Sequence, residues 1–275
     1  MHAMPAHLRA AEPTRDLVGM KWIGGFTTNS EKGISALNAL IVVNDPDTGV
    51  PLAVIDGGPI TAQRTAAVSG VAIRTFGPTI LDRPIKVALI GAGVQGRSHL
   101  PVLGHLLPGM EITIFDRHPE RAEALMDLAR GTDGIALART AVTAREAILN
   151  ADVVITAASF ASPEVRQVMR TDWLAPEALV VPVDYATYCS AEVAQQAALF
   201  VVDQREQFLA NRDIGNFDGY PDPATTLGEA IIAGASRAPG RVVVTHLGVG
   251  LADLIFADAI LARAAQAGLG LLLPR

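Results

Sequence analysis

The sequence predicts an α/β protein with a doubly wound parallel sheet and a smaller α+β part. From residue 85 onward, short apolar runs alternate with helical stretches, a pattern typical of parallel strands joined by crossover helices. The first 80 residues contain instead two apolar runs around a dense turn. Half of the 275 residues are hydrophobic but only 5% are aromatic, so aliphatic side chains must fill the core.

The N-terminal part is expected to form a β-hairpin followed by a helix. Two apolar runs, residues 39–43 and 51–55, flank the turn Asn44-Asp45-Pro46-Asp47-Thr48-Gly49. Residues 60–76 then read as a helix, with Thr61 as a candidate N-cap.

The parallel sheet is expected to begin at residues 85–90, because an uninterrupted apolar run is typical of a strand covered on both faces. Further strands are predicted at residues 111–115, 152–157, 178–183, 199–202 and 241–245. Helices are predicted at residues 95–106, 119–129, 191–197 and 250–267.

Charge and composition argue against several classes of protein. With 22 basic and 28 acidic residues the net charge is −6, which disfavours nucleic acid as the main partner but allows a local cationic pocket. The single cysteine, Cys189, suits a reducing compartment. No run approaches the roughly 20 apolar residues of a membrane span, and no metal-site spacing is present. We therefore expect a cytoplasmic protein with no metal and no membrane or nucleic-acid partner.

A glycine-rich motif follows the first strand of the predicted sheet. In Gly91-Ala92-Gly93-Val94-Gln95-Gly96, Gly91 permits a tight turn and Gly93 lets a pyrophosphate approach the backbone. Gly96 lets the following helix pack closely, and the helix N-terminus, at Val94 and Gln95, faces the phosphates. The sequence therefore predicts a Rossmann-type dinucleotide site.

The residues after the next strand bear on the choice of dinucleotide. Asp116 lies 25 positions after Gly91, where a carboxylate can accept hydrogen bonds from the adenosine ribose. Arg117 could pair with a 2′-phosphate or could lie in solvent. We favour NAD and keep NADP as the alternative.

Two basic residues could bind an anion. Arg64 is predicted in the first turn of the 60–76 helix, where it and the unpaired amides would suit a carboxylate or phosphate. Lys21 lies among apolar neighbours, Met20, Trp22 and Ile23, so it either extends to solvent or faces an anionic ligand.

Polar residues at the carboxyl ends of the predicted strands are candidates for chemistry, because ligands bind at that edge of a parallel sheet. Asp184 is the best candidate for a general base, since burial would raise the pKa of its carboxyl group. Ser159 is a candidate cofactor contact, and a helix cap remains the alternative for any acid at such a position. His246 also ends a strand, where a histidine is more often structural than catalytic, and both roles stay open.

These motifs together resemble the ornithine cyclodeaminase/μ-crystallin family over nearly the whole chain. Its specific motif T-x-x-R-T-A-A is matched by Thr61-Ala62-Gln63-Arg64-Thr65-Ala66-Ala67. Other matching segments are Met4-Pro5, Lys21-Trp22, Asn29, the 44–53 hairpin, the glycine motif with its Gln, residues 152–157, Val183-Asp184, and Gly248 with Asp253.

The resemblance implies a homodimer with two domains. Residues 1–80 with 237–275 would form the substrate and dimerisation domain, and residues 81–236 the dinucleotide-binding domain. Lys21 and Arg64 would hold the carboxylate of a small amino or imino acid, and Asp184 would act on its amine. The implied activities are NAD-dependent ornithine cyclisation with loss of ammonia, alanine dehydrogenation and cyclic imine reduction, with non-catalytic dinucleotide binding as the alternative.

The sequence departs from the family pattern at two places. The family usually has roughly fifty residues before its Met-Pro motif, so we expect a substrate domain that is short at its N-terminus. His246 stands where a small polar residue, often serine, is common. Both departures leave the substrate open.

Overall fold

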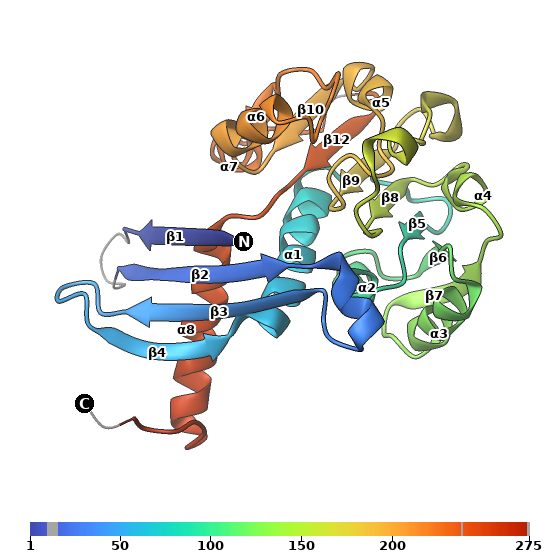
Figure 1. The fold of residues 1–275 in the computed structure, drawn as a ribbon. Helices are drawn as coiled ribbons and strands as arrows, with labels where there is room; N and C mark the ends of the chain where they lie inside the picture. The colour runs from blue at the N-terminus through green and yellow to red at the C-terminus, as the bar shows by residue number, and fades with distance from the viewer. Residues whose placement is uncertain (10–15, 238, 274–275) are drawn as a thin grey trace. The chain divides into compact units, whose positions relative to one another are not determined.

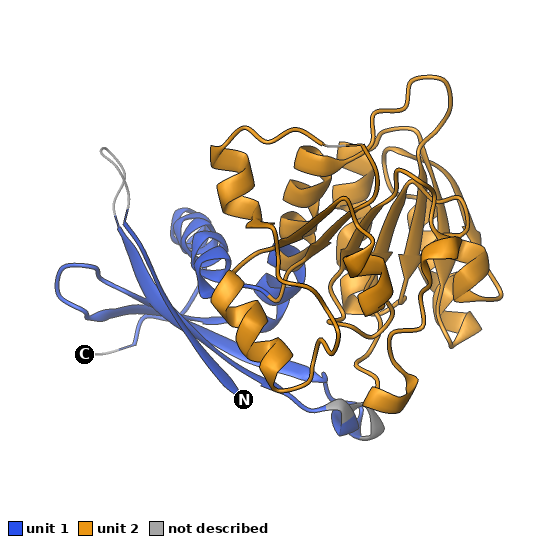
Figure 2. Cartoon of the chain, turned by 90° about the horizontal axis from the view of Figure 1, so that it is seen from above, with its two compact units in different colours: residues 1–64, 248–275 blue, residues 65–247 orange. Residues whose placement is uncertain are grey.

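The computed structural model describes residues 1–9, 16–237 and 239–273, which divide into two compact units (Figure 2). The first comprises residues 1–64 and 248–275, and the second comprises residues 65–247. The division falls within helix α1 (Gly57–Phe76) and shortly after strand β12 (Val242–Thr245). From the sequence we expected the boundaries after residues 80 and 236, so the observed second unit is longer at both ends.

The first unit is a four-stranded antiparallel sheet with one helix packed across it (Figure 1). Its strands follow one another in chain order: β1 (His2–Leu8), β2 (Leu17–Gly25), β3 (Leu37–Asn44) and β4 (Pro51–Asp56). Ile41 and Val43 of the sheet pack against Leu254 and Ala257 of helix α8 (Gly250–Gln266). A Cβ on Gly19 would collide with the Val42 carbonyl group and the Leu254 side chain, so β2 can lie this close only with glycine there.

The second unit is an eight-stranded sheet in which all neighbouring strands run parallel. The strand order is β11-β10-β12-β9-β8-β5-β6-β7. The chain winds outward from β5 to β7 and then returns to place β8 on the other side of β5, so the topological switch lies between β5 and β8. Besides β12, the strands are β5 (Lys86–Ile90), β6 (Met110–Phe115), β7 (Ile135–Thr140), β8 (Val153–Thr156), β9 (Leu179–Pro182), β10 (Leu199–Val202) and β11 (Thr225–Thr226).

Helices cover both faces of this sheet, as a doubly wound fold requires. Alternate residues of β5 belong to different apolar layers: Val87 and Leu89 pack with α1, α2, α3 and α7, whereas Ala88 and Ile90 pack with α4, α5 and α6. The helices are α2 (Val94–Leu106), α3 (Pro119–Arg130), α4 (Ala144–Ile148), α5 (Ala191–Gln195), α6 (Arg205–Asp213) and α7 (Leu227–Ile232), and the 3-10 turns are η1 (Thr27–Lys32), η2 (Pro163–Val165) and η3 (Thr171–Trp173). The predicted fold class is confirmed.

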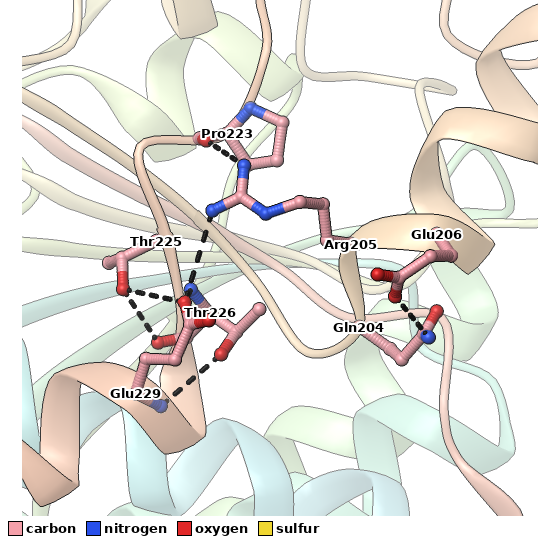
Figure 3. A network of polar contacts seen from close by, with 7 residues as sticks. All are labelled: Gln204, Arg205, Glu206, Pro223, Thr225, Thr226 and Glu229. Carbon is pink, nitrogen blue, oxygen red and sulfur yellow. Dashed lines mark hydrogen bonds and ion pairs between the residues drawn. The ribbon is translucent and has the colours of Figure 1, made fainter.

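The edge of the sheet at β11 is held by polar contacts (Figure 3). Thr226 caps α7 by accepting from the Glu229 amide at 3.2 Å, and the Glu229 carboxylate accepts from the Thr226 amide at 2.8 Å. Arg205 donates to the Pro223 carbonyl group at 2.6 Å and lies 3.9 Å from the same carboxylate. This capping box and ion pair fix a two-residue strand that has few ladder bonds of its own.

Candidate active site

The glycine loop lies at the topological switch of the sheet, and each of its glycines is required for a different reason. Gly91 has φ +106°, and a Cβ there would collide with Ala157 and Ala158, which follow β8. A Cβ on Gly96 would collide with the Gly91 carbonyl group. Gly93 instead has open space above its Cα. Of the three glycines, Gly93 alone has the space in which a ligand could approach the backbone, as a bound pyrophosphate requires. We call this loop the glycine cradle.

Helix α2 starts inside this loop. Gly93 is its N-cap residue and provides no side-chain cap, so the first amides, beginning at Val94, can be used by a ligand. The Gln95 side-chain oxygen is buried without a hydrogen-bond partner among the described residues. The free amides fit a dinucleotide phosphate, whereas the Gln95 oxygen can only accept and would need a hydrogen-bond donor as its partner.

A cleft of about 240 Å³ extends from the loop. It brings together the predicted residues Gly91, Gly93, Asp116, Arg117 and Ser159. It is also lined by residues that the sequence analysis did not single out, among them Arg121, Val165, Thr187 and Tyr188.

Asp116 is fixed at the end of β6 by two backbone amides. Its Oδ2 accepts from the Ala92 amide at 2.8 Å, and its Oδ1 accepts from the His118 amide at 2.9 Å. Each oxygen keeps a further lone pair, so the carboxylate can still accept from a ribose hydroxyl group.

Asp184 lies directly beside the glycine cradle. Its Oδ1 accepts from the Thr156 hydroxyl group at 2.8 Å, and its Oδ2 accepts from the Ala158 amide at 3.2 Å. That amide belongs to the backbone against which Gly91 packs. Burial raises the pKa of the Asp184 carboxyl group to about 7, because the hydrogen bonds, which lower the pKa, offset only part of the effect of burial. The expected rise in pKa is confirmed.

The first unit contains a buried cluster of three charged residues, Lys21, Arg64 and Asp253. Asp253 Oδ2 lies 2.7 Å from Lys21 Nζ, and its Oδ1 accepts from Arg64 Nε at 3.0 Å. All three side chains are almost fully buried. Gly248, at φ +93°, lies against the outer nitrogens of the guanidinium group, where any Cβ would collide with them.

These contacts correct two expectations from the sequence. Helix α1 begins at Gly57, so Arg64 lies two turns inside it and the amides of the first turn do not join its site. Lys21 does not extend to solvent, and its ammonium group has partners within the chain without any ligand. Asp253 pairs with it, and the Thr61 hydroxyl group lies 3.5 Å from its Nζ.

The cluster keeps a net positive charge. Burial and the nearby Arg64 lower the pKa of Lys21 to about 8, while Asp253 acts in the opposite direction, so Lys21 is mostly protonated at pH 7. Two cations then share one carboxylate. An anionic ligand would balance the remaining charge in a setting where Coulomb attraction is strong.

A second buried network joins Ser69, His99 and His246. The Nδ1 of His99 lies 2.7 Å from the Gln95 carbonyl oxygen, which can only accept, so Nδ1 carries the hydrogen. Burial lowers the pKa of His99 to about 4, so the ring is neutral and its Nε2 accepts from the Ser69 hydroxyl group at 2.9 Å. Ser69 Oγ then accepts from His246 Nε2 at 2.9 Å. His246 is therefore held in one tautomer.

Among the described residues, no group of three or more His, Cys, Asp or Glu side chains could hold a metal ion. Within the same residues, no helix is both long enough and apolar enough to cross a membrane.

Comparison with known proteins places the chain in a family. The family model described as ornithine cyclodeaminase/mu-crystallin family matches residues 1–266. The chain belongs to this family. It is 32% identical over 277 residues to the nodulation efficiency protein NfeD of Rhizobium meliloti, covering 98% of this chain and 82% of that protein. It is 30% identical to the ketimine reductase mu-crystallin of Mus musculus, covering 94% of this chain and 78% of that protein.

A solved structure shows the same fold. The Thermococcus litoralis Δ1-pyrroline-2-carboxylate reductase, in complex with NADH and L-proline, matches with a TM-score of 0.78. The two share 23% sequence identity, over 98% of this chain and 90% of that one.

The charged cluster leads to a first prediction. Asp253→Ala leaves two buried cations without their carboxylate, so the free energy of unfolding should fall by about 3–5 kcal/mol. The exposed Glu123→Ala in α3 is the control and should change it by less than about 0.5 kcal/mol. Urea unfolding of both variants measures this. A loss under about 1 kcal/mol for Asp253→Ala would show that the Asp253 carboxylate is not needed to stabilise the buried Lys21 and Arg64.

The histidine network leads to a second prediction. His99 has a pKa of about 4 in the folded chain and 6.5 when unfolded, so only the unfolded chain binds its proton between these values. Protonation of His99 in the unfolded chain therefore lowers the free energy of unfolding as pH falls, by roughly 2 kcal/mol at pH 5. Between pH 8 and pH 5, the free energy of unfolding measured with urea should fall by roughly 2 kcal/mol more in the wild type than in His99→Gln. Parallel pH profiles for the two proteins would contradict the assignment.

Proposed function

We propose that the chain is an NAD(P)-dependent enzyme that transfers hydride at Cα of a small α-amino or α-imino acid. The observation that carries the proposal is Asp184, a buried carboxyl group with a pKa of about 7 beside a dinucleotide cradle. A group with that pKa can both take and give a proton near neutral pH. Membership of the family and the identity to a ketimine reductase add support.

The cofactor would be held by the residues of the cleft. The loop from Gly91 to Gly96 would hold the pyrophosphate, Asp116 the adenosine ribose, and Ser159 would contact the cofactor after β8. When bound, the nicotinamide accepts or supplies the hydride. Tyr188 also lines the cleft, and burial together with the charges of Asp184 and Asp116 raises the pKa of its phenol, so it stays a neutral donor.

The substrate carboxylate would be held by the charged cluster. With Lys21 protonated, Lys21, Arg64 and Asp253 sum to one positive charge, which a carboxylate neutralises. A guanidinium group bonded to Asp253 through Nε presents its outer nitrogens as a fork suited to a second carboxylate. Fixing the carboxylate restricts the orientations that the rest of the substrate can take.

Asp184 would handle the proton. In oxidation the Cα–H electron pair leaves as hydride, the C=N bond forms, and the amine proton moves to the Asp184 carboxylate. In reduction the protonated carboxyl group gives that proton to the nitrogen as hydride arrives at Cα. Thr156 and the Ala158 amide hold the carboxylate in place throughout.

A panel of amino acids and cyclic imines, with nicotinamide absorbance and ammonia followed together, tests the activity. Net change in absorbance indicates a dehydrogenase or reductase. Ammonia release without net change indicates a cyclodeaminase, in which the side-chain amine attacks the imine and the hydride returns. Neither signal, with dinucleotide binding retained, would leave a non-catalytic binding protein and overturn the proposal.

We also propose that a second copy of the chain packs on the open face of the antiparallel sheet. The face that carries Lys21 and Ile41 is covered by α8, whereas Trp22, Leu40 and Val54 point the other way and are 52%, 50% and 61% exposed. Trp22 and Leu40 are paired across β2 and β3, so the apolar surface is continuous. Such a patch is typical of a subunit interface.

The proton role leads to a third prediction. Oxidation needs the Asp184 carboxylate, so its kcat should fall as pH is lowered through about 7, and reduction needs the acid, so its kcat should fall as pH is raised through about 7. Asp184→Asn should remove both limbs and lower kcat by about 10²–10⁴ while cofactor affinity changes little.

The control for Asp184→Asn is Asp203→Asn, which changes the acid that follows β10, and it should keep both pH limbs. Steady-state kinetics in both directions with cofactor titration makes the measurement. Near-normal kcat with lost cofactor binding in Asp184→Asn would show that Asp184 is a nucleotide ligand or a structural residue.

The open sheet face leads to a fourth prediction. Trp22→Glu and Leu40→Glu place a charge in the proposed interface and should each shift a dimer toward monomer by at least about tenfold in dissociation constant. Leu81→Glu is the matched control, because Leu81 is 93% exposed in the second unit and lies outside this face. Sedimentation equilibrium measures the shift, and a wild type that is monomeric at micromolar concentration would rule the interface out.

A further inference from the structure

We propose that Gln167 is a positioning residue for Asp184, and that it makes the position of this carboxyl group depend on whether the dinucleotide cleft is occupied. The connection runs through residues 158–168, which we call the cleft loop. The inference rests on the proposed function in giving Asp184 the proton role. It goes further by naming the residue that holds Asp184 and by linking it to the cofactor site.

The cleft loop takes part both in the cleft and in the site of Asp184. It lines the cleft through small and apolar residues: Ala158, Ser159, Ala161, Val165 and Val168. The Ala158 amide, at the start of the loop, donates to Asp184 Oδ2 at 3.2 Å. A residue of the cleft wall therefore also holds the carboxylate.

The far end of the loop is bonded to the turn that follows Asp184. The Gln167 amide donates to the Ala186 carbonyl group at 3.1 Å and to the Thr187 carbonyl group at 2.9 Å. The Tyr188 amide, in the same turn, bonds to the Asp184 carboxylate. Thr187 and Tyr188 line the cleft as well. The two ends of the cleft loop thus reach Asp184 by different routes, one through its carboxylate and one through its turn.

An aromatic contact joins the same two segments. The Phe160 ring of the cleft loop meets the Tyr185 ring edge-on, with the centroids 4.9 Å apart. Tyr185 also stacks on the buried Phe217 ring, at 5.5 Å between centroids. Tyr185 directly follows Asp184, so the loop packs against the immediate neighbour of the proposed proton carrier.

Both segments contain strained backbone. Gln167 has φ +60° and Tyr185 has φ +58°, in the left-handed region that residues other than glycine rarely adopt. Such conformations persist only where the surroundings fix them. Here the two strained residues lie in segments that the hydrogen bonds of the Gln167 amide join. The arrangement around Asp184 therefore depends on the contacts of Gln167.

The Gln167 side chain holds this strained position in place. Its Nε2 donates to the Asp218 carbonyl group at 3.0 Å, and its Oε1 accepts at 2.8 Å from the amide of Ala191, where helix α5 begins. Both ends of the side-chain amide are thus bonded to backbone groups. Without them, the backbone amide of Gln167 alone would have to hold the strained turn against the loop.

The titratable groups described around Asp184 are neutral near pH 7. They are the Tyr188 phenol of its own turn, the Cys189 thiol, and the Tyr220 phenol from the segment between α6 and β11. Burial raises the pKa of all three, to about 12 for Cys189. The backbone amides bonded to Asp184 lower the pKa of its carboxyl group, so loosening these bonds raises it.

Nuclear magnetic resonance of the chain labelled with ¹³C at the aspartate carboxyl carbons tests the inference without turnover. The signal of Asp184 is identified by its loss in Asp184→Asn. In Gln167→Asn its titration midpoint should rise by about 0.5–1 pH unit, because the amide bonds loosen. Asparagine tolerates the left-handed conformation, so the fold is kept, but its side chain is one methylene group shorter. Gln167→Gly, which removes the strain as well, should shift the midpoint in the same direction.

The cofactor should reverse part of this change. A dinucleotide in the cleft orders the loop, so saturating NADH should bring the midpoint of Gln167→Asn at least half-way back to the wild-type value. Because linkage is reciprocal, protonation of Asp184 should weaken NADH binding in this variant. Between pH 9 and pH 6 its affinity for NADH should fall about two- to tenfold more than that of the wild type, measured by nicotinamide fluorescence.

Gln195→Ala is the matched control. The Gln195 side chain also bonds to the backbone beside Asp218, since its Nε2 donates to the Gly219 carbonyl group at 2.7 Å. That bond leads to the same segment but not to the turn after Asp184. The variant should therefore change neither the midpoint nor the pH dependence of NADH binding.

The outcomes separate this inference from the proposed function. A midpoint that stays at the wild-type value in both Gln167 variants, or that shifts equally in Gln195→Ala, would overturn the positioning role. A shift that saturating NADH leaves unchanged would overturn the link to the cleft. The enzyme proposal stands in each case if Asp184→Asn still lowers kcat. If no aspartate signal of the wild type titrates near pH 7 and is lost in Asp184→Asn, both proposals fail.

Discussion

The close approach of the Gly91 turn to the backbone of Ala157 and Ala158 is the constraint on which the dinucleotide unit depends. It joins the ends of β5 and β8, the two strands at which the winding of the sheet reverses. Any side chain at Gly91 would push these strand ends apart. The same contact places the Ala158 amide against Asp184, so the turn that shapes the cofactor cradle also positions the proposed proton carrier.

The sequence predicted most of this unit because its signals are local. The strand before Gly91, the helix after it and the acid that closes β6 all lie within one βαβ segment. Strand β7 was missed because Ile135 and Leu137 are its only large apolar residues and Arg139 and Thr140 end it. Strand β2 was missed because Gly19, Lys21 and Gly24 interrupt the alternation that marks a strand. Strand β1 was missed because it contains Pro5, which argues against a strand.

The charged cluster could not be predicted in its true form, because its members are distant in the chain. Asp253 is 189 positions from Arg64, and only the fold of the first unit brings the two together. The helix start was misplaced for a local reason. The residues Gly57-Gly58-Pro59 look like a loop, yet Asp56 accepts from the Gly58 amide at 2.9 Å and α1 begins there. Because the helix was predicted to begin at residue 60, Arg64 was expected in its first turn, where unpaired amides bind anions. In the structure Arg64 lies two turns inside α1, and its partner is the Asp253 carboxylate.

The three buried aspartates that the structure describes differ in their partners, and the difference explains why only one suits proton transfer. Burial raises the pKa of Asp152, but hydrogen bonds from Arg83 and the Lys86 amide outweigh it and hold the pKa below its usual value. Asp253 has two cations in contact. Asp184 accepts from the Thr156 hydroxyl group and from backbone amides, all of which are neutral, so burial prevails and its pKa rises to about 7. A cation beside a buried carboxylate favours the ionised form, which strengthens the ion pair but makes the carboxylate a poorer base. Of the buried aspartates in the described residues, Asp152 and Asp253 are therefore suited to holding structure and Asp184 to exchanging a proton.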